Sequence, residues 1–173
     1  MTTTASQTIG PYWHLLLEKE WADLTRFGAE GEKIHLQGTI RDGDGNLVKD
    51  ACVEIWQASP EASDKFQGFG RATSDRETGL FRFTTIKPGP VPGRGNTMQA
   101  PHFAITILAR GILIAIHTRA YFEGEALNET DPLLSMIEDP ARRHTLIARK
   151  VSDDTWHMDI VLQGEGETVF LDI

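Results

Sequence analysis

The sequence is poorest in cysteine, of which it contains one. Cys52 alone excludes an intrachain disulfide and is typical of a protein kept in a reducing compartment. It lies in the apolar segment 51–57, which favours a buried, inert thiol over a reactive nucleophile. Packing and hydrogen bonds, without a covalent cross-link inside the chain, are therefore expected to hold the fold together.

Long apolar runs are also missing. A transmembrane helix needs about 18 or more predominantly apolar residues in a row, and the sequence has no such stretch. The first ten residues, MTTTASQTIG, lack the basic and apolar regions of a secretory signal. Both absences predict a cytoplasmic protein.

Positive charge is scarce. The chain has 17 Lys and Arg against 25 Asp and Glu, which gives a formal net charge of −8. This balance argues against general binding of nucleic acid. Any small anionic ligand must therefore be met by a local cluster of Arg and Lys.

Tyrosine is nearly absent, since Tyr12 and Tyr121 are the only two in the sequence. No tyrosine lies between Trp56 and His102. Hard ferric iron favours anionic oxygen donors, and imidazole alone holds it poorly. A ferric site built from two phenolates of this chain is therefore not expected.

Apolar residues recur in short, alternating runs separated by Gly and Pro, which is the pattern of β-strands. The sequence DGDGN at 42–46 is typical of a hairpin turn. Asp131 as N-cap predicts a helix over 132–138, and a second helical turn is expected at 141–143. The fold class is all-β: one antiparallel β-sandwich domain over 1–173, with short helical segments and long Pro/Gly-rich loops. The expected strands are 34–40, 51–57, 81–84, 103–108, 112–116, 146–150, 157–162 and 168–171.

The segment 87–93, KPGPVPG, cannot pair as a central strand, because proline lacks the N–H that a sheet requires. Its alternate prolines keep the backbone extended and stiff. A stiff loop can hold a ligand in place or shield one end of the sandwich. Shielding is favoured here, because Val91 at its centre offers no donor atom.

Arg110 and Gly111 are expected to form a two-residue turn between two apolar strands. Ala104 would then lie opposite His117, with His102 diagonal to His117 on the same face. This register permits a two-histidine metal site, although strand histidines are more often hydrogen-bonded core or interface residues. Arg110 at the tip is either solvated or reaches across an interface to an anion with its planar fork of donors.

The N-terminal sequence SQTIGPYW has no strand or helix period. Its composition predicts an ordered tail. Tyr12 and Trp13 are large amphipathic residues of the kind enriched at interfaces, so a binding role is the alternative.

Three sequences in this chain, VEIWQA, TIKPGPVPG and PHFAITILA, resemble motifs of the intradiol ring-cleavage dioxygenases. The corresponding family motifs are WQA, TIKPGPYP and AHIHF, and the resemblance implies a fold that binds ferric iron through two tyrosines and two histidines. Here Val91 replaces the tyrosine of the second motif and Ala104 the second histidine of the third. His102 alone keeps the identity of a ligand. Gln99 stands where the catalytic chains have an arginine.

The segments SQTIGPYWH, LARGILIAIHTRAYF, RRHTLIARK and QGEGETVFLDI resemble the iron-free alpha chains of this family. The resemblance implies a homologous catalytic beta chain that holds Fe(III), an active site at the interface for an aromatic diol and O2, and a larger alpha–beta oligomer. It makes 1–31 an interface segment, although the segment 59–71 is short for the family. It implies no metal ligand in this chain. The substrate-binding residues that it implies are Thr8, Gly10, Pro11, Tyr12 and Arg110.

Two other functions stay open at this point. A metal-free β-sandwich with a stiff loop is also the architecture of transthyretin-like binding modules, although such a module has no need of SQTIGPYW beside the LARG turn. An independent metalloenzyme that uses His102 and His117 would carry metal in the purified chain.

We predict that this chain, purified alone, is colourless and free of iron, because tyrosinate-to-iron charge transfer has no pair of tyrosines to arise from. Val91→Tyr combined with Ala104→His should not restore activity, since the upstream tyrosine is missing too. Elemental analysis and visible spectra of both proteins provide the measurement. Stoichiometric iron with visible absorbance in the chain alone would contradict the prediction.

Overall fold

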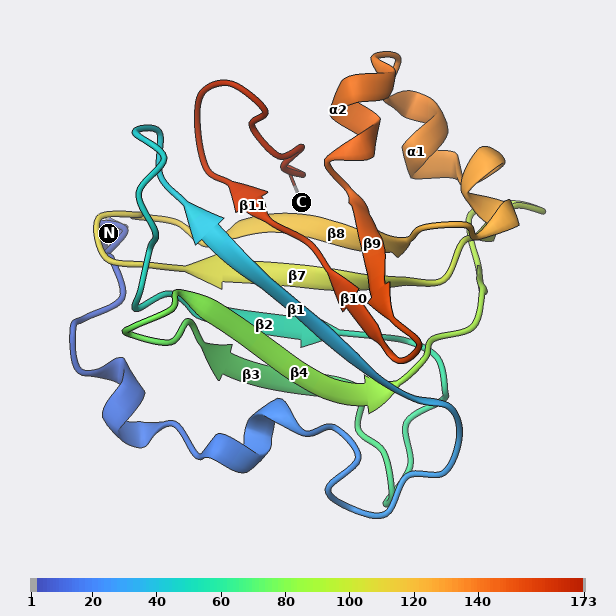
Figure 1. Ribbon diagram of the computed structural model, residues 1–173, viewed down its shortest axis with the longest axis horizontal. Helices are drawn as coiled ribbons and strands as arrows, with labels where there is room; N and C mark the ends of the chain where they lie inside the picture. The colour runs from blue at the N-terminus through green and yellow to red at the C-terminus, as the bar shows by residue number, and fades with distance from the viewer. Residues whose placement is uncertain (1–2, 173) are drawn as a thin grey trace.

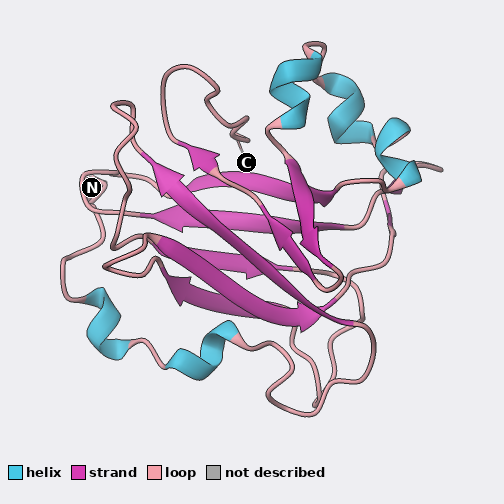
Figure 2. Ribbon diagram, viewed as in Figure 1, coloured by secondary structure: helices cyan, strands magenta, loops and turns pink. Residues whose placement is uncertain are grey.

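The computed structural model describes residues 3–172, which form a β-sandwich with short helices at its edges (Figures 1 and 2). The strands are β1 Lys33–Arg41, β2 Cys52–Trp56, β3 Phe69–Thr73, β4 Leu80–Ile86, β5 Val91–Pro92, β6 Met98–Gln99, β7 His102–Leu108, β8 Ile116–Phe122, β9 Ile147–Ser152, β10 Thr155–His157 and β11 Ile160–Val161. The 3-10 helices are η1 Trp13–Leu16, η2 Lys19–Ala22 and η3 Ala126–Glu129, and the α-helices are α1 Pro132–Met136 and α2 Pro140–His144.

The strands form two layers that cross face to face (Figure 1). One layer contains β4, β1, β10 and β11, and the other contains β3, β2, β7 and β8. Strand β9 pairs with β8 on one side and β10 on the other, so it joins the two layers. The short strands β5 and β6 pair only with each other. The predicted all-β sandwich is confirmed.

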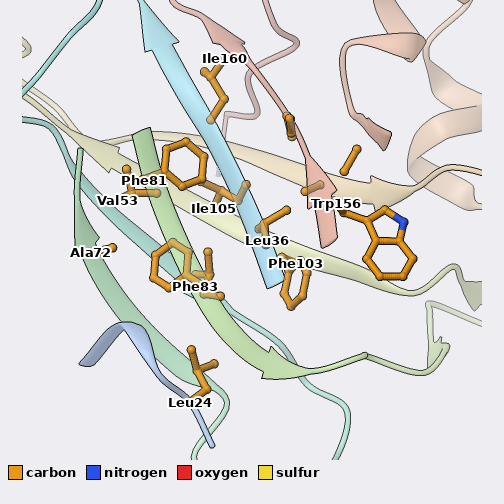
Figure 3. Close-up of a cluster of buried hydrophobic side chains, with 14 of the residues drawn as sticks. Leu24, Leu36, Val53, Ala72, Phe81, Phe83, Phe103, Ile105, Trp156 and Ile160 are labelled. Atoms are coloured by element: carbon orange, nitrogen blue, oxygen red, sulfur yellow. The ribbon is translucent and has the colours of Figure 1, made fainter. Parts of the chain in front are cut away.

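Alternation along the strands builds the core between the layers. In β1, Ile34, Leu36 and Ile40 are fully buried, whereas the alternate residues 35, 37 and 39 are partly exposed. Phe103 and Ile105 of β7 enter the same core from the facing layer (Figure 3). Burial of each large apolar side chain contributes about 1.5–3 kcal/mol. The period-two pattern thus turns apolar side chains of both layers toward each other, and their burial stabilises the packing of the layers.

The sheet is less uniformly antiparallel than predicted. β1 pairs in parallel with both β10 and β11, and β8 pairs in parallel with β9. The expected strand 157–162 is divided between β10 and β11, and the expected strand 168–171 forms only an isolated bridge between Leu171 and His117. The sequence pattern indicated where extended segments lie but not which neighbours they find, because strand pairing is a non-local choice.

The loop between β7 and β8 is longer than the predicted two-residue turn. Residues 109–115 form the connection, so the expected strand 112–116 was wrong and β8 begins at Ile116. The register pairs Ala104 with Arg119, which places His117 opposite Thr106. Leu113 and Ile114 are 59% and 67% exposed, so this apolar run does not enter the core of the chain. An apolar sequence indicates a tendency to be buried, and it does not specify the surface that buries it.

The helix predicted after Asp131 is confirmed and is shorter than expected, ending at Met136. The Asp131 carboxylate accepts hydrogen bonds from the N–H groups of Leu133 and Leu134, as an N-cap should. The second helical turn is also confirmed as α2, with Asp139 as its N-cap. Both helices lie beside the end of the sandwich at which β7 begins (Figure 1).

Gln57, from the WQA sequence at the end of β2, fixes the stiff proline loop. Its amide nitrogen donates to the carbonyls of Ser59, at 2.5 Å, and Ile86, at 2.9 Å. Its amide oxygen accepts from the Thr85 hydroxyl at 2.6 Å. The Gly89 N–H adds a bond to the Ser59 hydroxyl at 3.1 Å. The proline loop therefore leaves β4 in a set direction and pairs only as the two-residue strand β5.

The N-terminal segment runs along the outside of the sandwich from the β7–β8 loop past β3 (Figure 1). It contains the two helices η1 and η2, which the sequence did not predict. Leu24 is buried in the core, and its N–H donates to the Thr84 carbonyl at 2.8 Å. Within residues 3–172, no helix has the length and apolar character needed to cross a membrane.

We predict that Gly38→Ala strongly destabilises the fold. A Cβ at this buried position of β1 would collide with the Met158 carbonyl oxygen, a backbone atom that cannot move aside easily. The free energy of unfolding in urea should fall by about 3 kcal/mol, at the upper end of usual overpacking costs. Gly43→Ala is the matched control, because its Cβ would lie 3.4 Å from the flexible Gln163 side chain. Equal stability of both variants would refute the assigned close approach.

Candidate functional site

The first candidate site lies where the family motifs place a metal, among β5, β6, β7 and β8. Val91 pairs with Gln99 across the β5–β6 ribbon. The Gln99 amide donates to the Pro92 carbonyl at 3.1 Å, and its oxygen accepts from Arg119 Nη1 at 2.8 Å. The same Nη1 donates to the Tyr121 hydroxyl oxygen at 3.1 Å. A guanidinium therefore links the residues around the expected ligand positions.

Tyr121 lies in β8 and is fully buried. Its hydroxyl donates to Asp131 Oδ1 at 3.1 Å, and Asp131 Oδ2 accepts from the Ala100 N–H at 2.8 Å. Burial raises the pKa of Tyr121, and the neighbouring Arg119 opposes this only in part. The phenol is therefore a neutral hydrogen-bond donor at physiological pH.

His102 lies across the ladder from Tyr121, with ring centroids 5.4 Å apart. Its Nδ1–H donates to the Ala100 carbonyl at 2.7 Å. Burial lowers the pKa of His102, although the bond to Ala100 opposes the shift. The imidazole is held neutral in a packed position.

These residues do not fit ferric iron. The Tyr121 hydroxyl stays protonated and donates a hydrogen bond to Asp131, and it accepts a hydrogen bond from the Arg119 cation. Within the described part of the chain, no three His, Cys, Asp or Glu side chains converge as a metal site would require. The register also rules out the two-histidine site. His102 pairs with Tyr121 whereas His117 pairs with Thr106, so the two histidines lie about 13 Å apart along the strands. His117 Nδ1 lies 3.1 Å from the Thr106 hydroxyl instead.

Cys52 is buried within β2, as predicted. Burial raises the pKa of its thiol to about 12, and the nearby Glu54 acts in the same direction. A thiol in this state is not a nucleophile at neutral pH.

The second candidate site lies at the other end of β7, where the N-terminal segment meets the β7–β8 loop. The Thr8 hydroxyl donates to the Ala109 carbonyl and accepts from the Gly111 N–H, both at 2.9 Å. Thr8 therefore holds the loop on both sides of Arg110. We call this pair of bonds the Thr8 clasp.

Three of the five predicted substrate-binding residues, Pro11, Tyr12 and Arg110, line one cavity of about 810 Å³. Thr8 does not line the cavity and instead holds the loop through the clasp, and Gly10 lies in the exposed segment between Thr8 and Pro11. Tyr12 is 72% exposed, so most of its ring is free for contact. The structure thus brings together residues that lie about a hundred positions apart in the sequence.

The cavity also contains residues that the sequence did not single out. Asp50 Oδ2 lies 2.5 Å from Arg110 Nε, in an ion pair whose acid side is the less exposed. Arg76 donates to His14 Nε2 at 2.8 Å, so this imidazole nitrogen must be the acceptor. Lys49 completes the basic lining. No sequence signal could have found these pairs, because each joins two segments that are distant in the chain.

Comparisons with known proteins agree with the motifs. A family model described as Dioxygenase matches residues 10–164. The protocatechuate 3,4-dioxygenase alpha chain of Pseudomonas putida is 41% identical over 192 residues, covering 98% of this chain and 96% of the relative. The protocatechuate 3,4-dioxygenase beta chain of Burkholderia cepacia is 31% identical over 160 residues, covering 80% of this chain and 67% of the relative.

A solved structure supports the fold. The dioxygenase domain of a dioxygenase carbohydrate-binding fusion from Streptomyces sp. SirexAA-E superimposes with a TM-score of 0.64 at 24% identity. The match covers 94% of this chain and 99% of that domain. At this identity the likeness concerns the architecture alone.

We predict that His102 makes the protein less stable in mild acid. Its pKa is lowered in the fold, so the unfolded chain takes up a proton first as pH falls below about 6.5, and stability is lost from there down through the folded pKa. Urea unfolding at pH 7.5 and 5.5, followed by tryptophan fluorescence, should show a smaller acid loss for His102→Asn than for wild type. His144→Asn, at an exposed position, is the control and should behave as wild type. If all three proteins lose the same free energy of unfolding between pH 7.5 and 5.5, His102 is not the cause of the acid sensitivity.

Proposed function

The chain belongs to the intradiol ring-cleavage dioxygenase family, and we propose that it is the iron-free alpha subunit of a protocatechuate 3,4-dioxygenase. The contrast between its two sites carries this proposal. Two of the family's ligand positions hold Val91 and Ala104, which offer no donor atom, and His102 packs against a neutral phenol. By contrast, the Thr8 clasp presents Arg110 to an open cavity. Such a chain is suited to complete a pocket for a partner. Similarity to an alpha chain over nearly its whole length supports this role.

The partner would be a homologous beta chain that holds Fe(III) through tyrosines and histidines of its own. When bound there, the iron supplies the activation of a catechol for reaction with O2. The ring of 3,4-dihydroxybenzoate opens between its two hydroxylated carbons, and both oxygen atoms of O2 enter the product, 3-carboxy-cis,cis-muconate. We expect the present chain to be inactive alone.

The role of this chain would be to form one wall of the pocket, exclude water and orient the substrate. Arg110 is the residue best suited to meet the substrate carboxylate, because a guanidinium presents paired donors that match carboxylate geometry. A charge-assisted hydrogen bond of this kind contributes roughly 1.5–3 kcal/mol. Thr8, Gly10, Pro11 and Tyr12 would form the adjoining wall.

Exposed apolar side chains around the cavity support burial by a partner. Tyr12 and Leu15 are 72% and 70% exposed, and Leu113 and Ile114 project from the loop that carries Arg110. We propose that 1–31 is the interface segment of one domain spanning 1–173, in a cytoplasmic alpha–beta oligomer. The free, buried Cys52 is consistent with that compartment.

Co-expression with a beta homologue that carries intact KPGPYP and AHIHF motifs tests the proposal. The two chains should co-sediment as a stable complex, contain iron and oxygenate protocatechuate, whereas this chain alone should be poorly soluble or self-associate. A well-behaved monomer without affinity for the beta chain would refute the subunit role. That outcome would favour a stand-alone binding module.

We predict that Arg110→Ala lowers kcat/KM for protocatechuate about 10- to 150-fold in the complex, because it removes one charge-assisted hydrogen bond. The loss should be smaller for catechol, which has no carboxylate, and Arg110→Lys should rescue only in part. Stability should change by no more than about 1 kcal/mol, since the pair with Asp50 is partly exposed. Wild-type kinetics in an Arg110→Ala complex with unchanged iron would assign Arg110 to a solvated role.

A further inference from the structure

Arg110 is held by an acid of its own chain. Asp50 Oδ2 contacts Nε of Arg110 at 2.5 Å, and the side chains of the two residues are 26% and 59% exposed. The carboxylate therefore lies beneath the guanidinium and the guanidinium lies toward solvent. The two residues are 60 positions apart in the sequence, counted from 50 to 110, so only the fold brings them together.

Both members of this ion pair have an anchored backbone. The Asp50 carbonyl accepts from Trp13 Nε1 at 3.1 Å, and the N–H of the next residue, Ala51, donates to the Ser74 hydroxyl at 2.9 Å. The Arg110 backbone is flanked by the Thr8 clasp. The ion pair therefore joins two fixed points, and it sets the direction of a long side chain that would otherwise sample many rotamers.

The geometry leaves the far edge of the guanidinium for another acceptor. A guanidinium has five N–H donors, and the Asp50 carboxylate makes its ion-pair contact at the Nε side. Within residues 3–172, neither terminal Nη group of Arg110 makes a hydrogen bond, and the contact with Asp50 is at Nε. These two nitrogens form the parallel fork that binds a carboxylate with two hydrogen bonds. Arg110 lines the cavity of about 810 Å³, so the fork is available to a ligand there.

The charge around the cavity favours a second anion in spite of Asp50. The charged residues that line the cavity are Lys49, Arg76 and Arg110 against Asp42 and Asp50, which gives a net charge of +1 when His14 is counted as neutral. The chain as a whole carries −8. A carboxylate at the Nη edge therefore enters a locally positive environment, which Asp50 reduces but does not reverse.

We propose that Asp50 is a positioning residue: by binding Nε it directs the Nη edge of Arg110 toward the carboxylate of the aromatic substrate. Asp50 thereby sets the preference of the enzyme for carboxylated over uncarboxylated catechols. This inference rests on the proposed function. Asp50 touches neither the substrate nor the iron and acts through Arg110 alone.

The test is a double-mutant cycle in the alpha–beta complex, with kcat/KM measured for protocatechuate and for catechol. The ratio of the two values reports carboxylate selectivity, and a merely structural change would lower both values equally. Asp50→Ala should lower this ratio about 5- to 10-fold, chiefly through KM for protocatechuate. Asp50→Asn should lower it less, because the amide keeps the shape of the carboxylate and an oxygen that can contact Nε. In the Arg110→Ala background, Asp50→Ala should change the ratio no further.

Asp44→Asn is the matched control, since it removes the same charge from an exposed turn six positions before Asp50 in the sequence and should leave the ratio unchanged. A wild-type complex that fails to form or to oxygenate protocatechuate overturns the proposed function together with this inference. If Arg110→Ala leaves the ratio unchanged, the subunit role stands but the inference falls. The inference alone falls if Asp50→Ala raises the ratio or lowers both kcat/KM values equally. It also falls if Asp50→Ala changes the ratio as much in the Arg110→Ala background as in the wild-type background.

Discussion

The arrangement of one end of this protein depends on the buried carboxylate of Asp131. Its Oδ1 accepts from the Tyr121 hydroxyl on β8 and from two N–H groups of α1, and its Oδ2 accepts from the Ala100 N–H before β7. A buried carboxylate is tolerated only when its oxygens are fully hydrogen-bonded. The helix α1, the segment before β7 and the end of β8 are therefore tied to one another. From Tyr121 the network continues through Arg119 and Gln99 to the proline loop.

This network explains how a chain of this family can be complete without a metal. The end of the sandwich that holds His102, Tyr121 and Asp131 contains its own cation, Arg119, and its own anion. Residue types alone would still suggest ligand chemistry here. The hydrogen bonds decide otherwise, because the neutral Tyr121 hydroxyl donates a hydrogen bond to Asp131 and accepts one from a guanidinium. Losing the tyrosine at position 91 is thus one part of a wider replacement.

The opposite end of β7 has the reverse character (Figure 1). The Thr8 clasp and the Asp50 pair order the backbone and the Nε of Arg110, yet the terminal guanidinium edge and the apolar side chains of Tyr12, Leu113 and Ile114 face outward. One end joins His102, Tyr121 and Asp131 to hydrogen-bond partners within the chain, and the other presents ordered but incomplete contacts. That asymmetry is the physical basis for the proposal that this chain contributes to a pocket shared with a partner.

The sequence by itself determined the strands whose side chains alternate, such as β1, the capped helix after Asp131, and the lack of phenolates for ferric iron. Each of these follows from local periodicity, local hydrogen bonding or composition. Only the tertiary structure decided the β7–β8 register, the Tyr121–Asp131–Arg119 network and the pairing of Asp50 with Arg110. The segment 112–116 was misassigned because its apolar residues indicate burial without naming the surface that buries them. The loop that replaces it is held by Thr8, a residue about a hundred positions away, and no local pattern contains such a contact.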